Sequence, residues 1–494
     1  MIRDLLIQLK NSSKTGLICG GAILSYAQWH NISEKISLEN LRDLPGKIVG
    51  IFLPNGIAYA VSYFACLYAD KVIAPFYTGS TLNELAYTVK HCAISTMITT
   101  EKYVSIIESL VQIYGIPLNI VLLDDNLEVQ STMVMKKVNL VESIDDLNEL
   151  NDVVVLLHTS GTTSKPKRVM LTNKGLLHNI QAHCESLNWC ENEVCLIQLP
   201  MMFGYCNTAQ FLAHVYLGAC IVINPFPFLA ADFYKIVEER KVTNFTAVPS
   251  ILNILSKHNT LNYDISSLKT VCFGGNPISK EKLIEIMYKF PTIAFVQTYG
   301  LTEAGPRVTT LPIQKCNEKV GSVGRAISGV EIKIIDRTGR NLAYGEIGEV
   351  LIKSKSIMKG YFRDSEETEK ILHSEWLYSG DIGYLSEDGY LYIIGRKKNV
   401  IISGGLNICP EEIEEIIMNF EGVVDVIVFG EYDNLLGEVV CADIVVENND
   451  TEIVEQLRKL CAEKLSDYKI PKKIRLVDKI ERTYNGKIKR VREG

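Results

Sequence analysis

The stretch that decides the fold is the apolar run Val153-Val154-Val155-Leu156-Leu157 and the polar decapeptide that follows it, Thr159-Ser160-Gly161-Thr162-Thr163-Ser164-Lys165-Pro166-Lys167-Arg168. The apolar run predicts a buried strand, and the decapeptide predicts a loop at its end. Such a loop gathers backbone N–H groups, hydroxyls and ammonium charge in one small volume, which suits a polyphosphate. The stretch therefore predicts a phosphate-binding loop in an α/β protein.

The loop differs from that of kinase-type nucleotide-binding proteins. Those proteins end the loop in Gly-Lys-Ser/Thr, whereas Pro166 precedes Lys167 here. Pro166 fixes its own φ angle and removes a donor, which stiffens the loop beside the lysine. Taken alone, a run of Ser, Thr and Gly is more typical of a solvated turn, so the interpretation depends on other segments.

Further motifs point to one family. The segment 151–172, together with the motifs below, resembles signatures of the acyl-adenylate-forming enzymes: the acyl- and aryl-CoA synthetases, the adenylation domains of peptide synthetases, and firefly luciferase. The motifs occur in that family's order between Asn151 and Arg490. They are Thr298-Tyr299-Gly300-Leu301-Thr302-Glu303, then Tyr378-Ser379-Gly380-Asp381 with Gly395-Arg396-Lys397-Lys398, and finally Asn485-Gly486-Lys487-Ile488-Lys489-Arg490.

The hydrophobic pattern predicts the architecture. Short apolar runs alternate with stretches of helical spacing, which predicts parallel sheets with helices on their faces. From about residue 331 short β-rich segments separated by glycine turns predict a small β-subdomain. We expect strands at 47–53, 120–123, 153–157, 219–223, 268–273, 330–335, 348–353 and 389–394, and helices at 176–184 and 278–288.

A change of composition at residues 395–399 predicts a domain boundary. Beyond it, Pro410 followed by two glutamates indicates a helix start, and the last hundred residues suggest the order β-α-β-β-α-β. The resemblance implies a large N-terminal AMP-binding domain, 1–396, made of two parallel α/β subdomains and a β-barrel-like subdomain at about 330–395. It also implies a small mobile α+β lid, 397–494, with its hinge at Lys398.

Composition narrows the class of protein. A chain of 494 residues is expected to form two or more domains, and 47% hydrophobic with 22% charged residues is typical of a soluble globular protein. The net charge of −7 gives no reason to expect nucleic acid as a partner. Residues 468–494 are basic, with ten Lys and Arg against three Asp and Glu, which alone would suggest a solvated tail. The resemblance implies instead that this segment closes over ATP and a negatively charged thiol carrier.

The cysteines and the apolar runs indicate the compartment. Thirteen scattered cysteines without a close Cys-x-x-Cys pair favour reduced thiols in a reducing compartment. The N-terminus lacks a signal-peptide pattern, and the longest apolar run, 211–223, contains His214 and is too short to span a bilayer. We expect a soluble, cytoplasmic protein without a membrane span.

The resemblance assigns nucleotide-binding roles residue by residue. It gives the β- and γ-phosphates to Thr159, Ser160, Gly161, Thr162, Thr163 and Lys167. Ser164 and Arg168 stand where the family usually has glycine. If either position needs a positive φ, strain of about 1 kcal/mol is expected; Arg168 could instead add positive charge for the phosphates.

The resemblance also implies the rest of the ATP and magnesium site. Tyr299 would lie flat against adenine beside Gly300, Thr302 would contact the α-phosphate, and Glu303 would hold Mg²⁺. The loop Gly274-Gly275-Asn276 would form the adenine pocket, where glycine lets the backbone approach the purine. Asp381 would accept hydrogen bonds from both ribose hydroxyls, with Arg396 beside it.

The C-terminal motif implies a moving catalytic group. Lys487 would reach the α-phosphate and the carboxylate oxygens during adenylation, and rotation about Lys398 would then withdraw it. The same rotation would bring in Gly404 and Gly405, whose small size suits a narrow channel for a pantetheine thiol.

The resemblance places the acyl pocket at the segment 200–207, where Phe203 and Tyr205 would line an apolar slot. No aspartate lies in 203–210 to pair with an ammonium group, which disfavours an α-amino acid substrate. Arg307 is near this segment in the expected fold, and its partner is left open between the substrate, a phosphate and an internal acid.

The resulting prediction is an AMP-forming acid–thiol ligase. It would convert an aryl or acyl acid and ATP into acyl-AMP and pyrophosphate, and then transfer the acyl group to CoA. One alternative acceptor is the phosphopantetheine arm of a carrier protein. Another alternative is a homologue that binds nucleotide or acyl-AMP without turnover. A third is a luciferase-like oxidation of the adenylate, which no feature of the sequence demands.

Overall fold

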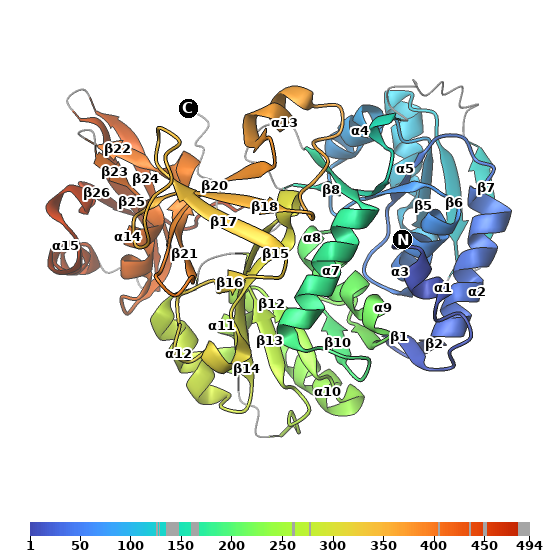
Figure 1. Cartoon of the computed structure of the whole chain (residues 1–494), viewed down its shortest axis with the longest axis horizontal. Helices are drawn as coiled ribbons and strands as arrows, with labels where there is room; N and C mark the ends of the chain where they lie inside the picture. Colours follow the sequence, from blue (N-terminus) through green and yellow to red (C-terminus); the bar gives the residue numbers. More distant parts are fainter. Residues whose placement is uncertain are drawn as a thin grey trace.

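Four β-sheets organise the described part of the chain, and Figure 1 shows them in sequence colours from the N-terminal region to the C-terminal region. The computed structural model describes residues 1–124, 127, 129–134, 148–159, 167–258, 262–275, 278–403, 406–433, 436–447 and 452–482. Two mainly parallel sheets, one antiparallel sheet and one C-terminal sheet follow from the strand pairing.

The first sheet has seven strands in the order β7-β6-β5-β3-β4-β8-β9. Its centre is parallel, and the outer pairs β6–β7 and β8–β9 are antiparallel. The strands are β3 (Ile48–Ile51), β4 (Val72–Pro75), β5 (Thr96–Thr100), β6 (Asn119–Leu123), β7 (Val129–Val134), β8 (Val153–His158) and β9 (Arg168–Thr172).

Helices cover both faces of this sheet because successive strand residues point to opposite sides. Val155 and Leu157 belong to the core shared with α3, whereas Val153 and Leu156 belong to the core formed with α4 and α5. The helices of this region are α2 (Tyr26–Ile36), η1 (Ser37–Leu41), α3 (Ile57–Tyr68), α4 (Leu82–His91), α5 (Glu101–Tyr114) and α7 (Asn173–Leu187).

The second sheet has nine strands in the order β16-β15-β14-β13-β12-β10-β11-β1-β2. It is parallel from β1 to β14, and the pairs β1–β2, β14–β15 and β15–β16 are antiparallel. The strands are β1 (Thr15–Cys19), β2 (Ala22–Ser25), β10 (Val194–Ile197), β11 (Cys220–Ile223), β12 (Asn244–Ala247), β13 (Thr270–Phe273), β14 (Ala294–Leu301), β15 (Gly305–Thr310) and β16 (Arg325–Ala326).

Short helices connect these strands. Helix α12 begins after Ser279, whose hydroxyl accepts a hydrogen bond from the N–H of Lys282 at 3.3 Å and caps the helix. The helices are α1 (Asp4–Ile7), α8 (Gly204–Cys206), η2 (Asn207–Leu212), α9 (Ala213–Leu217), α10 (Ala230–Arg240), α11 (Pro249–Lys257), α12 (Lys280–Lys289), η3 (Thr302–Ala304) and η4 (Ile313–Lys315).

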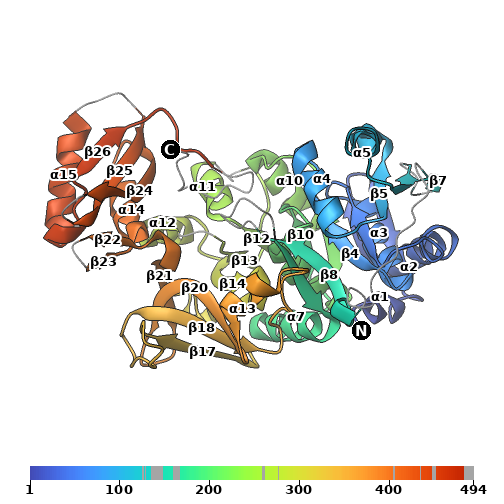
Figure 2. The same cartoon turned by 90° about the horizontal axis from the view of Figure 1, so that it is seen from above.

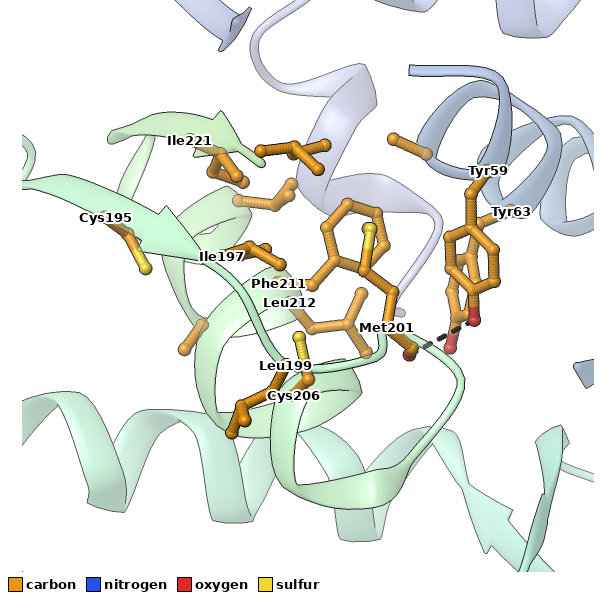
Figure 3. Close-up of a cluster of buried hydrophobic side chains, with 14 of the residues drawn as sticks. Tyr59, Tyr63, Cys195, Ile197, Leu199, Met201, Cys206, Phe211, Leu212 and Ile221 are labelled. Carbon is orange, nitrogen blue, oxygen red and sulfur yellow. Dashed lines mark hydrogen bonds between the residues drawn. The ribbon is translucent and has the colours of Figure 1, made fainter. Parts of the chain in front are cut away.

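One hydrophobic core joins the two parallel sheets. Figure 3 shows part of it, where Tyr59 and Tyr63 of α3 meet Met201 and Phe211. The Tyr59 hydroxyl donates to the backbone oxygen of Met201 at 3.2 Å, which satisfies a polar group inside the core. This packing holds the segment that follows β10, which carries Phe203 and Tyr205, against the first sheet.

The third sheet is antiparallel and begins where the sequence predicted a β-rich subdomain. Its order is β17-β18-β20-β19, and β21 also pairs with β20. Gly389 has a φ of 78° in the turn before β21, which begins two residues later than expected. The elements are β17 (Val330–Ile335), β18 (Gly348–Ser354), α13 (Ser365–Ile371), β19 (Leu372–His373), β20 (Trp376–Leu385), β21 (Leu391–Arg396) and η5 (Lys397–Asn399).

The C-terminal part has a sheet and a hydrophobic core of its own. All the described residues of that core come from Ile401 onward, and the sheet order is β23-β22-β25-β24 with β26 paired to β25. Both views place it at the end of the molecule opposite α2 (Figures 1 and 2). Its elements are β22 (Ile401–Ser403), β23 (Leu406–Ile408), α14 (Pro410–Met418), β24 (Val423–Asp433), β25 (Gly437–Val446), α15 (Glu452–Lys464), η6 (Asp467–Lys469) and β26 (Lys473–Leu476).

The structure confirms the predicted α/β class, with a large N-terminal region of mainly parallel sheets and a small C-terminal α+β region. Helix α14 begins at Pro410, as the sequence predicted. Within the described ranges, no helix combines the length and the apolar character needed to cross a bilayer. The division at residue 396 and the hinge at Lys398 stay predictions.

Candidate active site

The polar loop connects the end of β8 to the start of β9, and these two strands pair with each other. These strands pair antiparallel, with His158 opposite Arg168, and the N–H of Thr159 donates to the backbone oxygen of Lys167 at 3.2 Å. This pairing therefore fixes both ends of the loop on adjacent strands. Ser160, Gly161, Thr162, Thr163 and Ser164 lie outside the described residues.

Lys167, at the end of the loop, is held by groups from the third sheet region. Its ammonium forms an ion pair with Glu367 of α13 and lies 4.8 Å from the centroid of the Tyr361 ring. The Tyr361 hydroxyl in turn donates to Glu303 Oε1 at 2.8 Å. A chain of contacts thus links the predicted phosphate-binding lysine to the predicted metal ligand.

Arg168 is a buried residue at the start of β9, and its conformation bears on the strain expected at this position. It begins β9 with a φ that is not positive, so the predicted strain at this position is absent. Its buried guanidinium donates to the carbonyls of Pro75 at 2.9 Å and Leu156 at 3.1 Å, and it lies over the Phe76 ring at 4.8 Å. The charge of Arg168 is therefore engaged by backbone carbonyls and an aromatic ring, and its suggested contribution to phosphate binding stays a prediction.

Tyr299, Asp381 and Arg396 meet although they are far apart in the sequence. Asp381 and Arg396 lie opposite each other on β20 and β21, and Arg396 Nε is 2.7 Å from Asp381 Oδ1. The Tyr299 hydroxyl donates to Asp381 Oδ2 at 2.5 Å. Burial raises the pKa of the Tyr299 phenol well above its ordinary value, and the charge of Asp381 raises it further.

Glycine is required where β13 ends. A Cβ atom at Gly274 would lie 2.5 Å from the backbone oxygen of Thr298 and 3.3 Å from the Tyr205 hydroxyl. Gly275 has a φ of 86°, which favours glycine. A Cβ at Gly300 would lie 2.4 Å from the Pro306 oxygen, so this position also needs glycine for packing. Asn276 lies outside the described residues.

The segment predicted to form the acyl pocket lies against these glycines. The hydroxyls of Tyr205 and Thr298 are 3.2 Å apart, and Thr298 also donates to the backbone oxygen of Phe273 at 3.1 Å. The Phe203 ring stacks on Tyr77 with centroids 6.4 Å apart. A Cβ on the neighbouring Gly204 would be 3.5 Å from Thr302, so this segment borders the motif 298–303, which is predicted to bind ATP and magnesium.

The region around Glu303 fits a hydrated magnesium ion. Mg²⁺ is usually held by one or two carboxylates together with phosphate oxygens and waters. Glu303 Oε1 accepts the Tyr361 hydrogen bond, which orients its carboxylate, and the backbone oxygen of Glu303 accepts from the N–H of Met358 at 2.8 Å. No cluster of three or more His, Cys, Asp or Glu suited to a metal occurs in the described part of the chain.

Several predicted site residues belong to the C-terminal part. Lys487, Gly404 and Gly405 lie outside the described residues. Lys398 is exposed on η5, next to Lys397, whose Nζ is 2.7 Å from Glu349 Oε2. The roles of these residues as catalytic group, thiol channel and hinge stay predictions.

The sequence interpretation missed Tyr361 and Glu367. Both follow β18, about 200 residues after the loop that they contact. The only local signal is the helix start at Asp364, whose carboxylate caps α13 by accepting from the N–H of Glu367 at 3.3 Å. That signal predicts a helix and says nothing about the partner of Glu367.

The comparisons with known proteins agree with the geometry. The AMP-binding enzyme family matches residues 8–362, and the AMP-binding enzyme C-terminal domain matches residues 412–487. A 4-coumarate–CoA ligase 2 of Nicotiana tabacum is 35% identical over 69% of this chain, and the match spans 64% of that relative's length. A long-chain-fatty-acid–CoA ligase of Bacillus subtilis is 31% identical over 90% of this chain and 85% of its own.

Solved structures match across nearly the whole chain. The o-succinylbenzoate CoA synthetase of Bacillus subtilis with its acyl-adenylate intermediate superposes with a TM-score of 0.86 at 25% identity, covering 98% of this chain and 96% of that one. The same synthetase with ATP and a magnesium ion has a TM-score of 0.84 at 25% identity, covering 98% of each chain.

The chain therefore belongs to the AMP-binding enzyme family, and the matches include the family's C-terminal domain. Its curated relatives are CoA ligases, which makes this protein a ligase of the acyl-CoA-synthetase-like, AMP-forming class.

Proposed function

We propose that this protein activates an organic acid, aryl or acyl, with ATP and then transfers the acyl group to the thiol of CoA. The observation that carries the proposal is a pair of side-chain groups, Tyr299–Asp381–Arg396 and Lys167–Tyr361–Glu303, which are linked by the short chain segment 299–303. The family match over both parts of the chain supports the assignment of these groups to ATP.

The first half-reaction makes a poor electrophile reactive. A carboxylate oxygen of the acid attacks the α-phosphorus of ATP, and the bond from that phosphorus to the bridging oxygen of pyrophosphate breaks. The protein's task is to hold the two reactants in line and to offset the charge that develops on the phosphates. Magnesium, when bound, supplies positive charge to the leaving pyrophosphate.

The described residues divide that task. Asp381 would bind the ribose hydroxyls, because both oxygens of a carboxylate accept hydrogen bonds, and Arg396 and Tyr299 hold this carboxylate in place. Lys167 would exchange its carboxylate partner, Glu367, for phosphate oxygens. Glu303 would hold the metal, and Thr302 would contact the α-phosphate. The close backbone at Gly274 leaves a flat surface for adenine.

The second half-reaction needs a different arrangement of the C-terminal part. We assign residues 397–494 as a lid that turns at Lys398, with Lys487 serving adenylation and Gly404 and Gly405 serving the thiol. The thiolate sulfur attacks the acyl carbon, and AMP leaves with the electrons of the broken C–O bond. The separate core of this part supports a rigid-body movement.

The test is a pyrophosphate-exchange screen over aryl, fatty and amino acids, followed by AMP release with CoA. Exchange and CoA-dependent AMP release are expected with aryl or acyl acids. Exchange without a response to CoA would favour a carrier protein as the acceptor, and no exchange with any acid would favour a non-catalytic homologue. Lys487→Ala is expected to abolish exchange and to spare thiolysis of supplied acyl-AMP; equal loss of both steps would contradict the lid assignment.

A further inference from the structure

Arg307 of β15 is a fully buried cation behind the predicted acyl pocket. Its exposed fraction is 0%, and Nη1 donates to the backbone oxygen of Pro306 at 3.1 Å. Nε and Nη2 find no hydrogen-bond partner within the part of the chain that the structure describes. Arginine keeps its charge in proteins, and the side chains that interact with this guanidinium, the Tyr205 phenol and the Cys272 thiol, are neutral groups rather than acids.

The groups around Arg307 carry no compensating charge. Burial raises the pKa of the Cys272 thiol to about 11 and raises that of the Tyr205 phenol, so both are neutral at physiological pH. Burial lowers the pKa of the His183 imidazole well below its ordinary value, and Arg307 lowers it further. Burial also lowers the pKa of His214 to about 4. Among the described residues, no carboxylate forms an ion pair with Arg307.

A buried cation of this kind is costly unless an anion joins it. Removing a charge from water carries a large desolvation penalty, and neutral partners recover only part of it. Arg307 lies 4.6 Å from the centroid of the Tyr205 ring, and this cation–π contact takes the position of a counter-ion. The guanidinium is therefore prepared for an anion that the described residues do not provide.

The location of Arg307 identifies where the anion would come from. Tyr205, which is only partly buried, covers the guanidinium and reaches the Thr298 hydroxyl at 3.2 Å, one residue before Tyr299. A Cβ on Gly300 would be 3.0 Å from the backbone N of Arg307. The ring of Tyr205 thus lies between the Arg307 guanidinium and the Thr298 hydroxyl, at the start of the motif 298–303.

We infer that Arg307 determines substrate specificity by binding a second carboxylate at the far end of the acid, with the Tyr205 ring moving aside to admit it. The inference rests on the function proposed above and narrows its substrate class to dicarboxylic acids. One carboxylate is adenylated, and the other forms a paired hydrogen bond with Nε and Nη2. A planar guanidinium matches a carboxylate in this two-point manner.

A substrate without the second carboxylate would leave the buried guanidinium unsatisfied. Sites built around a buried polar group discriminate strongly against analogues that lack its partner. We expect kcat/KM for exchange to be at least about 100-fold higher for a dicarboxylic acid than for the monocarboxylic acid of the same length. The difference should appear mainly in KM, because the far carboxylate is bound before and during the reaction.

The experiment compares matched pairs of acids on three proteins. Pyrophosphate exchange is measured with adipate against hexanoate, and with 3-(2-carboxyphenyl)propanoate against 3-phenylpropanoate. The proteins are the wild type, Arg307→Met, and the control Arg325→Met, whose exposed guanidinium also lies over a tyrosine, Tyr390, at 4.4 Å. We expect Arg307→Met to lose the preference for dicarboxylic acids and to gain activity with monocarboxylic acids, while Arg325→Met behaves as the wild type.

Binding without turnover separates this inference from the proposed reaction. The shift in unfolding temperature on adding each acid alone is measured for the same proteins, which needs neither ATP nor catalysis. A shift with dicarboxylic acids in the wild type and Arg325→Met, absent in Arg307→Met, supports the inference even if no acid supports exchange. Equal shifts or equal rates for both members of each pair, or a preference that survives in Arg307→Met, would overturn it. Because methionine replaces an unpaired buried charge by an apolar chain, the variant is expected to fold.

Discussion

Arg396 lies directly opposite Asp381 on neighbouring strands and donates through Nε to Asp381 Oδ1 at 2.7 Å. The carboxylate is 2% exposed, and its other oxygen accepts the Tyr299 hydroxyl. Two protein donors therefore fix the plane of the carboxylate before any ligand arrives. A pre-oriented acceptor of this kind loses little conformational entropy when it binds a diol.

Replacing the carboxylate with an amide tests this arrangement. Asp381→Asn keeps the shape but removes the charge that strengthens hydrogen bonds from ribose, and it places an NH₂ group against Arg396 or Tyr299. We expect KM for ATP to rise by about 10- to 100-fold, since hydrogen bonds to charged groups contribute about 1.5–3 kcal/mol. Asp232→Asn, on the exposed side of α10, is the control. An unchanged KM for ATP would contradict the ribose assignment.

The ion pair of Lys167 with Glu367 would compete with the proposed binding of phosphate by Lys167. Glu367→Gln weakens the ion pair with Lys167 and leaves the lysine available to ATP. Because such partly exposed pairs contribute about 0–1 kcal/mol, we expect KM for ATP to fall by up to about fivefold. Glu369→Gln, exposed on the same helix, should leave KM unchanged. A higher KM for ATP in Glu367→Gln would show that the carboxylate assists the nucleotide.

The ion pair of Lys167 with Glu367 should make the free energy of unfolding depend on pH. Hydrogen bonds from Lys167 and then Lys370 lower the pKa of Glu367 to about 2. A carboxyl whose pKa is lower in the folded state stabilises the protein above its unfolded pKa, and that contribution disappears as pH falls through the folded value. The stability difference between the wild type and Glu367→Gln, measured by urea unfolding, should therefore be larger at pH 7 than at pH 3. A difference independent of pH would exclude a charged pair.

Gly274 should not tolerate a side chain. The Cβ of Gly274→Ala would lie 2.5 Å from the Thr298 backbone oxygen, which cannot move without displacing β14. We expect a loss of about 1–3 kcal/mol in the free energy of unfolding, together with weaker ATP binding, as is typical of overpacking. Gly21→Ala, with no atom within 4 Å of its Cβ, is the control. Unchanged ATP binding in Gly274→Ala would remove this loop from the nucleotide site.

Gly395, on β21, lies against Glu411 of α14 in the C-terminal part. Its Cβ would lie 2.4 Å from Glu411 Oε2, and Glu411 Oε1 accepts from Asn399 at 2.6 Å. Gly395→Ala should therefore disfavour the orientation seen here and change the ratio of the exchange rate to the thiolysis rate. Shortening the opposing side chain in Gly395→Ala/Glu411→Ala should restore the ratio. If the double variant behaves as the single one, the contact does not control orientation.

The elements that the sequence predicted well are those whose cause is local. The strand at β8, the helix start at Pro410 and the bounds of β17 follow from short apolar runs and turn residues. The shift of β21 also has a local cause, because Gly389 adopts a positive φ and belongs to the preceding turn.

The partners of the charged site residues could not be predicted from local patterns. Glu367 reaches Lys167 from about 200 residues further along the chain, and nothing near either residue indicates the pair. The long side chain of Arg168, on β9, extends past β8 to Pro75 on β4, so its backbone position did not reveal its contacts. Family resemblance placed Tyr299 and Asp381 in one site, and the structure adds the hydrogen bond between them.

The independent core after residue 400 has an evolutionary consequence. Because the described members of that core all come from the C-terminal part, mutations there change its stability without disturbing the packing of the larger part. Recombination at the exposed Lys397–Asn399 segment would exchange one part for that of a homologue while leaving both sets of buried contacts intact. If the C-terminal part carries the proposed thiol channel, such exchange would let acceptor preference and acid preference diverge separately among the descendants of one ancestral gene.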